Sequence, residues 1–168
     1  NITLISEYFP YFNSGDINAL TNANQLPFIC TVGCKSGDFG GTCLGEMFTY
    51  ATNGGEPSGA IATFMSTIYQ SWAPPMEAQD EMVDILTESY SNNRKYTFGG
   101  ISLNGCLKMN DAYGSSGDDE TDHWTLFGDP SIALRTNAPI SISISHNGTI
   151  SEDEQAYEVI IDNSYDNL

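Results

Sequence analysis

The chain has 168 residues, of which 40% are hydrophobic and 16% charged, so it is apolar enough to fold around a core and too weakly charged for a disordered segment. Its 5 Lys and Arg stand against 22 Asp and Glu, a formal net charge of −17, which excludes nucleic acid as an expected partner because phosphate binding needs clustered cations. No apolar run is long enough to span a membrane, and the surplus of carboxylates suits a secreted or cell-surface protein that can recruit calcium.

The first predicted elements are a short helix and a buried strand. The helix is expected around residues 14–20, where Ser14 or Asp16 could cap its first turn. The apolar run 27–33 predicts the strand, which delivers Cys34 to a polar, glycine-rich segment. Chemistry in open α/β sheets takes place beyond the carboxyl ends of strands, so Cys34 is a candidate nucleophile. The alternative is that Cys34 is a small core residue.

Strands and helices alternate through the middle of the chain. Residues 44–51 carry apolar side chains at helical spacing, and Asn53-Gly54-Gly55 is expected to end this helix. The apolar run 59–65 predicts a second buried strand. Two further helices are predicted, one from Pro74-Pro75 to Asn92-Asn93 and one after Gly99-Gly100 with Cys106, Met109 and Tyr113 on one face. This alternation predicts an α/β fold with a largely parallel sheet.

An acidic, Ser/Gly-rich segment, residues 114–122, interrupts the pattern and is expected to be a loop. Asp118, Asp119 and Asp122 within it are candidate calcium ligands, because calcium takes several oxygen ligands from flexible loops. The segment has no EF-hand pattern, so a solvated loop without metal is the alternative.

The composition changes after Arg135. Isoleucines at 140, 142 and 144 alternate with serines, a turn is expected at 146–148, and alternation returns at 157–161. A period of two predicts antiparallel strands. An immunoglobulin-type sandwich needs about 100 residues, so the tail resembles only its opening strands.

The four cysteines are Cys30, Cys34, Cys43 and Cys106. None forms a Cys-x-x-Cys pair, which gives a zinc site little support. A disulfide between Cys43 and Cys106 is conceivable. Cysteine usage therefore does not settle the redox compartment.

Several segments together resemble the gingipain-type cysteine peptidases. The segments, in chain order, are Thr31-Val32-Gly33-Cys34, Gly37-Asp38-Phe39, Cys43-Leu44-Gly45-Glu46, Gly59-Ala60-Ile61-Ala62, Ser66-Thr67-Ile68, Gln70-Ser71-Trp72-Ala73, Pro75-Met76, Gln79-Asp80-Glu81-Met82, Thr97-Phe98-Gly99-Gly100 and the run from Trp124 to Ser131. The resemblance implies a caspase-like sheet with flanking helices, of which residues 1–135 form the C-terminal part. Residues 136–168 would then begin an immunoglobulin-like β domain, as in this family.

The resemblance also implies a site and a reaction. Cys34 would attack a peptide bond, its own N–H would contribute to the oxyanion hole, and Gly33 would leave room for the substrate backbone. Trp72 would form a wall of the substrate cleft, with an ordinary core aromatic as the alternative. Glu77, Asp80 or Glu81 could pair with a basic substrate side chain, or could simply be solvated in the first turns of the helix.

The catalytic histidine of this family is expected upstream of the chain, in a glycine-flanked turn. His123 and His146 do not match it, although His123 as a replacement base is an open alternative. A complementary N-terminal peptidase segment carrying the histidine is therefore an expected partner, and the chain alone is expected to be inactive. The expected substrate is a polypeptide, and no cofactor is expected to be required, although structural calcium could be bound.

The leading hypothesis is thus a cysteine endopeptidase. A sortase-like transpeptidase of the same family and a non-catalytic adhesion or scaffolding homologue are the alternatives.

Overall fold

A computed structural model describes residues 12–23, 25–136, 143–146 and 159–162. The chain divides into two compact units, Asn1–Thr136 and Asn137–Leu168. The elements of the first unit are α1 (Ser14–Asn18), β1 (Phe28–Thr31), α2 (Leu44–Tyr50), β2 (Thr52–Asn53), β3 (Glu56–Pro57), β4 (Ala62–Ser66), α3 (Ala73–Leu86), α4 (Phe98–Tyr113), α5 (Ser115–Asp122) and β5 (Trp124–Phe127). The second unit contains β6 (Ser143–His146) and β7 (Val159–Asp162).

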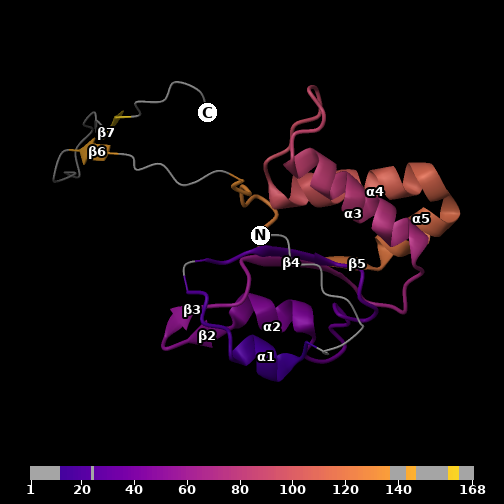
Figure 1. Cartoon of the computed structure of the whole chain (residues 1–168), viewed down its shortest axis with the longest axis horizontal. Coiled ribbons are helices and arrows are strands. Elements are labelled where there is room, and N and C mark those ends of the chain that lie inside the picture. Colours follow the sequence, from indigo (N-terminus) through magenta and orange to yellow (C-terminus); the bar gives the residue numbers. More distant parts are fainter. Residues whose placement is uncertain (1–11, 24, 137–142, 147–158, 163–168) are drawn as a thin grey trace, which may run out of the picture. The chain divides into compact units, whose positions relative to one another are not determined.

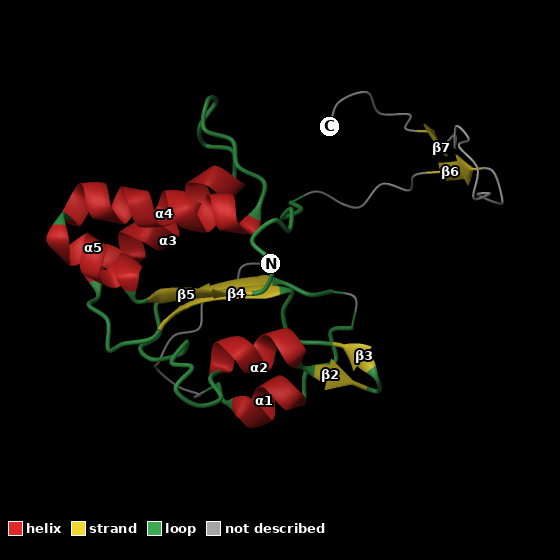
Figure 2. Cartoon of the chain, turned by 180° about the vertical axis from the view of Figure 1, so that it is seen from behind, coloured by secondary structure: helices red, strands yellow, loops and turns green. Residues whose placement is uncertain are grey.

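The first unit has three layers around a sheet with the strand order β1-β4-β5. Helices α3, α4 and α5 cover one face, and α1 and α2 cover the other (Figures 1 and 2). All four residues of β1 and all five of β4 are buried, because both faces are covered. The unit is therefore an α/β fold with flanking helices.

Each face of the sheet has its own apolar core. On the side of α3 and α4, the ring of Phe28 meets Phe98 edge to face at 4.2 Å between centroids. On the opposite face, Ile29 and Met65 pack in a cluster with Ile17 and Phe48. Phe28 and Ile29 are neighbours in β1, so the alternation of side chains along one strand supplies both cores.

The sheet is mixed, so the prediction of a largely parallel sheet was wrong. Strands β1 and β4 are parallel, with Thr31 beside Met65, whereas β5 runs antiparallel to β4, with Trp124 beside Ser66. The chain leaves β4 at Ser66, forms three helices and re-enters the sheet at Trp124. This helical connection begins and ends at the same end of the strands, so β5 runs in the opposite direction to β4.

Two segments differ from the sequence expectation. Asn53-Gly54-Gly55 forms the turn between β2 and β3 instead of ending a helix, because Gly54 and Gly55 adopt the positive φ values, 62° and 89°, that a hairpin turn needs. The acidic segment expected to be a loop forms α5. Its Gly117 packs so closely on α4 that a Cβ would lie 2.5 Å from the Met109 carbonyl oxygen.

Smaller corrections concern caps and cysteines. Helix α1 is capped by Asn13, whose side chain accepts from Gly15 N–H, while the Asp16 carboxylate accepts from Asn13 N–H. All four cysteines, which lie within the described ranges, are thiols, so the conceivable Cys43–Cys106 disulfide is not formed. Cys43 is the residue just before α2, and Cys106 lies in α4. These two helices cover opposite faces of the sheet.

In the second unit, β6 and β7 pair antiparallel, with Ser143 beside Asp162. The expected strands are therefore present in part. Of the turn expected at 146–148, His146 lies in β6, and residues 147 and 148 lie outside the described residues. Ile144 and Ile160 are about half exposed. The assignment of this unit to an immunoglobulin-like domain stays a prediction. Among the described residues, no helix is both long and apolar enough to cross a membrane.

The contact between α3 and α4 gives a stability prediction. A Cβ on Gly105 would lie 2.7 Å from the Ala78 carbonyl oxygen and 2.6 Å from Met82 Cε. Alanine normally stabilises a helix by about 1 kcal/mol relative to glycine, but this overlap should reverse the sign and destabilise by about 1–3 kcal/mol. Urea unfolding of Gly105→Ala measures the effect. Exposed Gly41, where a Cβ meets nothing within 4 Å, supplies the neutral control Gly41→Ala. Equal unfolding midpoints for the two variants would contradict the close packing.

Candidate active site

Cys34 lies on a tight turn just beyond the carboxyl end of β1. Gly33 N–H donates to Thr31 Oγ1 at 3.1 Å, and Ser36 Oγ–H donates to the Gly33 carbonyl at 2.8 Å. Lys35 adopts φ of +55°, an uncommon value for a residue with a side chain. Hydrogen bonds thus fix the turn around Cys34, and strain of this kind often accompanies functional sites.

The turn is also fastened across the end of β4. Lys35 N–H donates to the Ile68 carbonyl and Gly37 N–H to the Ser66 carbonyl, both at 2.9 Å. A Cβ on Gly37 would lie 2.8 Å from the Met65 carbonyl oxygen, so glycine permits this close approach. The turn is therefore held against β4, and the position of Cys34 follows from the sheet.

Cys34 faces the segment 67–71, which we call the bridging loop. The Sγ atom of Cys34 lies 3.9 Å from the carbonyl oxygen of Gln70. Lys35 Nζ lies 4.9 Å from the centre of the Tyr69 ring, a cation–π contact. Trp72, which follows the loop, is 68% exposed, so the alternative of an ordinary core aromatic does not hold. The loop that Cys34 faces therefore carries exposed Tyr69 and is followed by exposed Trp72.

Exposure distinguishes Cys34 from the other cysteines. Cys34 is partly exposed, whereas Cys30, Cys43 and Cys106 are buried. Desolvation by burial raises the pKa of the Cys106 thiol to about 11 and raises the pKa of the Cys30 thiol still further. Desolvation also raises the pKa of Cys43. Since the thiolate is the nucleophile, the raised pKa makes each of these three thiols less reactive at neutral pH.

The carboxylates proposed for a specificity pocket lie on α3 in different surroundings. Glu77 pairs with Lys108 of α4 at 3.8 Å. Glu81 is buried and accepts a hydrogen bond from Tyr90 at 2.8 Å. Asp80 is exposed, but it lies eight residues along the helix from Trp72, about 12 Å at 1.5 Å per residue.

Met76, which the sequence analysis did not propose as a site residue, is 41% exposed on the α3 surface one turn from Trp72. The i,i+4 spacing from Trp72 was the available signal.

Gly33 is partly exposed, and a Cβ there would approach Thr31 Oγ1 at 3.3 Å. The hydrogen bond between Gly33 N–H and that hydroxyl fixes the residue before the nucleophile. Its role in making room for a substrate stays a prediction, as does the oxyanion role of the Cys34 N–H.

His123 and Cys34 lie at the same end of the strands, but on opposite sides of β4. His123 follows α5 and precedes β5. Strand β5 lies two strand spacings from β1, about 10 Å. The Nδ1 atom of His123 lies 2.6 Å from the Asp119 carbonyl oxygen and 3.9 Å from that residue's carboxylate. The bridging loop hydrogen-bonds to both the His123 carbonyl and the Cys34 turn, so it lies between them. His146 belongs to β6 in the second unit.

The candidate calcium ligands Asp118, Asp119 and Asp122 lie on α5, not on a flexible loop. Across the part of the chain that the structure describes, no three His, Cys, Asp or Glu side chains are grouped to hold a metal ion. Calcium binding stays a prediction without geometric support from this segment.

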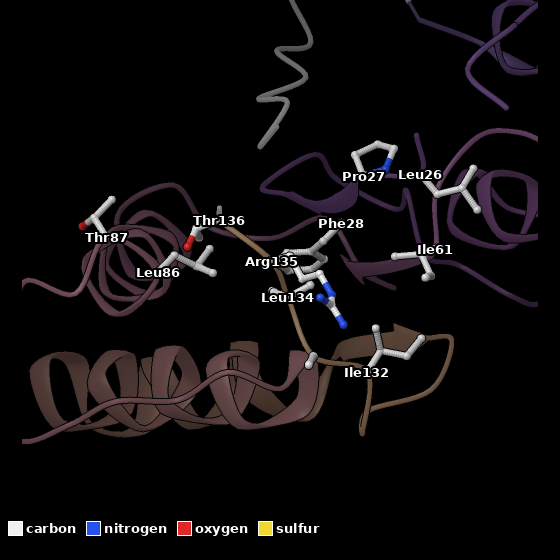
Figure 3. Close-up of a pocket in the computed structure, with 11 residues that line it drawn as sticks. Leu26, Pro27, Phe28, Ile61, Leu86, Thr87, Ile132, Leu134, Arg135 and Thr136 are labelled. Atoms are coloured by element: carbon white, nitrogen blue, oxygen red, sulfur yellow. The ribbon is translucent and has the colours of Figure 1, made fainter. Parts of the chain in front are cut away.

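A separate pocket lies near the start of β1, at the other end of the strand from Cys34 (Figure 3). Its volume is about 480 Å³, and Phe28, Ile61, Leu86 and Leu134 contribute apolar walls. Arg135 is the charged residue among its 11 lining residues. The 11 lining residues include no Cys, His, Asp or Glu.

Comparisons with known proteins show the family of the chain. Residues 3–135 match the model of peptidase family C25. The chain is 44% identical over 154 residues to gingipain R2 of Porphyromonas gingivalis, covering 90% of this chain and 21% of that protein. The solved structure of the Arg-specific cysteine proteinase gingipain R aligns with a TM-score of 0.80 and 42% identity, covering 95% of this chain and 38% of the other.

A solved complex of the pro- and mature domains of Porphyromonas gingivalis RgpB aligns with a TM-score of 0.77 and 41% identity, covering 96% of this chain and 40% of that chain. The chain thus spans about a fifth of gingipain R2 and two fifths of these solved chains.

The thiol environments predict selective alkylation. In the folded chain at pH 8, iodoacetamide should modify Cys34 faster than Cys106, because Cys34 is partly exposed whereas Cys106 is buried and a thiol of pKa about 11 is only about 0.1% thiolate there. Mass spectrometry of peptides at successive times measures the four rates. All four should converge in urea, which is the internal control. Equal rates at Cys34 and Cys106 in folded protein would contradict the assigned environments.

Proposed function

The chain belongs to peptidase family C25, as its resemblance to the gingipain-type peptidases predicted, and we propose that it supplies the nucleophile of a cysteine endopeptidase. The observation that carries this proposal is the position of Cys34. It is the partly exposed thiol of the chain, on a hydrogen-bonded turn beyond the carboxyl end of a buried strand.

In the proposed reaction, the Cys34 thiolate attacks the carbonyl carbon of a peptide bond. The carbonyl oxygen gains the negative charge, and the Cys34 N–H stabilises it in a turn that Gly33 keeps open. One such donor is worth about 3 kcal/mol of transition-state stabilisation. The amine leaves with a proton, and water hydrolyses the resulting thioester. The rigid turn holds the sulfur in place, so little order must be gained in the transition state.

The base in this reaction is proposed to be a histidine on a complementary N-terminal peptidase segment. One observation supports a base other than His123: the bridging loop lies between it and Cys34. Without a base, a cysteine of ordinary pKa is only a few per cent thiolate at pH 7. The chain by itself is therefore expected to be inactive.

The proposed substrate is a polypeptide with a basic side chain before the cleaved bond. Trp72 would form one wall of the pocket, since it is exposed beside the bridging loop. The net charge of −17 favours basic substrates. Among the predicted carboxylates, Asp80 is exposed, whereas Glu77 would have to leave its pair with Lys108 to bind a substrate.

The proposal extends to the organisation of the protein. Residues 1–135 would form the C-terminal part of a caspase-like peptidase domain, and residues 136–168 would begin an immunoglobulin-like β domain. A secreted or cell-surface location and structural calcium complete it, supported by the excess of carboxylates.

The test is an affinity label that requires both a pocket and an activated thiol. The chain, assembled with the complementary segment, is incubated with an Arg or Lys chloromethyl ketone, and the adduct is mapped by mass spectrometry. One adduct per chain on Cys34, absent in Cys34→Ala, is the expected result. Labelling by iodoacetamide but not by the peptide reagent would favour the non-catalytic homologue or another specificity. Products joined to an added amine would indicate the sortase-like transpeptidase.

The cleft-wall assignment gives a kinetic prediction. Trp72→Ala should raise KM for a basic peptide substrate about tenfold, equivalent to about 1.4 kcal/mol of binding, while the unfolding free energy changes little because the side chain is exposed. The matched control is Tyr50→Ala, which removes an aromatic that is 58% exposed on α2. An unchanged KM in Trp72→Ala would show that Trp72 does not contact the substrate and would contradict its assignment to the cleft wall.

A further inference from the structure

Glu120 of α5 is a buried carboxylate that the proposed chemistry does not use. Its side chain is 4% exposed, although it lies within an acidic run. Its Oε1 atom accepts hydrogen bonds from Ser71 N–H at 2.6 Å and from Ser71 Oγ at 2.5 Å. Burying a carboxylate is costly unless it is hydrogen-bonded, and bonds to a charged acceptor are the strong ones. The contact is therefore a strong tie between α5 and the bridging loop.

Two further ties hold the same side of the bridging loop. Thr67 donates its N–H and its hydroxyl to the His123 carbonyl, at 2.8 Å and 3.0 Å. Trp124 Nε1–H donates to Gln70 Oε1 at 2.7 Å. With the contact to Glu120, the loop is attached at three points to the junction of α5 and β5.

The other side of the bridging loop faces the nucleophile. The Ile68 carbonyl accepts from Lys35 N–H, and the Gln70 carbonyl lies 3.9 Å from Cys34 Sγ. Ser71 is followed by Trp72, whose exposed ring has little core packing to hold it. The attachment of Ser71 is the last one before Trp72, so it limits where Trp72 can lie.

We infer that Glu120 is a positioning residue: it fixes Ser71, and thereby holds the Gln70 carbonyl and Trp72 in place beside Cys34 for substrate binding. This inference rests on the proposed function, because it names the residue that orders that same site. A loop fixed in advance spares the substrate the entropic cost of ordering it on binding. Loss of Glu120 should then weaken substrate binding more than it slows the chemical step.

The chain offers a graded set of variants. Glu120→Leu removes the one oxygen atom that accepts from both Ser71 N–H and Ser71 Oγ–H. Glu120→Gln keeps one acceptor oxygen, and its amide nitrogen can take the place of Oε2, which has no hydrogen-bond partner among the described atoms. Glu120→Gln should therefore rescue most of the effect. Asp111→Asn, on an exposed residue of α4, controls for the loss of one negative charge.

The first measurement needs no peptidase activity. Amide hydrogen exchange at Ser71, followed by NMR in the chain as it stands, reports whether its N–H is bonded. Glu120→Leu should lower the protection factor roughly tenfold to a hundredfold, the effect of losing a hydrogen bond to a charged group. Glu120→Gln should change it less than about threefold, and Asp111→Asn not at all. Unchanged protection in Glu120→Leu would overturn the inference.

The second measurement separates positioning from folding. In the assembled peptidase, Glu120→Leu should raise KM for a basic peptide about tenfold and lower kcat per titrated active site less than threefold. A merely structural role would reduce the titrated fraction and leave KM unchanged, which would overturn the inference. Glu120→Gln should restore KM.

If Glu120→Leu does not fold, Ser71→Ala takes its place, since it removes the hydroxyl bond at the loop surface. It should raise KM about threefold, and an unchanged KM would count against the inference. If Cys34→Ala retained full turnover, the proposed function would fail instead, while the exchange result would still report on Glu120.

Discussion

The burial of β4 is the constraint on which the rest of the first unit depends. Every residue of this strand is buried, both of its edges are paired, and helices cover both of its faces. A polar group along such a strand must be hydrogen-bonded within the fold, as Thr63 is to the Gly45 carbonyl, and other polar groups gather where the strand ends. The Cys34 turn, the bridging loop and the junction of α5 and β5 all meet beyond Ser66. The site is therefore a consequence of how the core is built.

The groups around Cys34 are held by hydrogen bonds more than by packing. The Cys34 turn contacts the bridging loop through backbone bonds, and the loop contacts the α5–β5 junction through Thr67, Gln70 and Ser71. Tyr69 and Trp72 meanwhile remain exposed. Such an arrangement keeps apolar surface available for a substrate while the backbone beneath it stays ordered. Exposed aromatics on an ordered backbone are what a pre-organised binding site requires.

Sequence patterns predicted the buried strands and the long helices because apolar periodicity records which faces are covered. Cys34 could be found because it directly follows such a strand. The direction of β5 could not be predicted, because periodicity describes faces and contains no information on strand direction. Helix α5 was missed because its Ser, Gly and Asp residues favour turns, whereas Gly117 allows close packing on α4. Glu120 was missed for a related reason: a carboxylate within an acidic run suggests a solvated surface, and only the fold brings Ser71 to it.

The central claim is that Cys34 forms a covalent bond with the substrate, and trapping the acyl-enzyme tests it most directly. The assembled peptidase would be mixed with a basic peptide ester, quenched in acid within the first turnover, and analysed by mass spectrometry. If Cys34 is the nucleophile, an acyl group should be added to Cys34, and hydroxylamine should remove it, as expected of a thioester. Steady turnover with no acyl group on Cys34, or with the group on another residue, would contradict it.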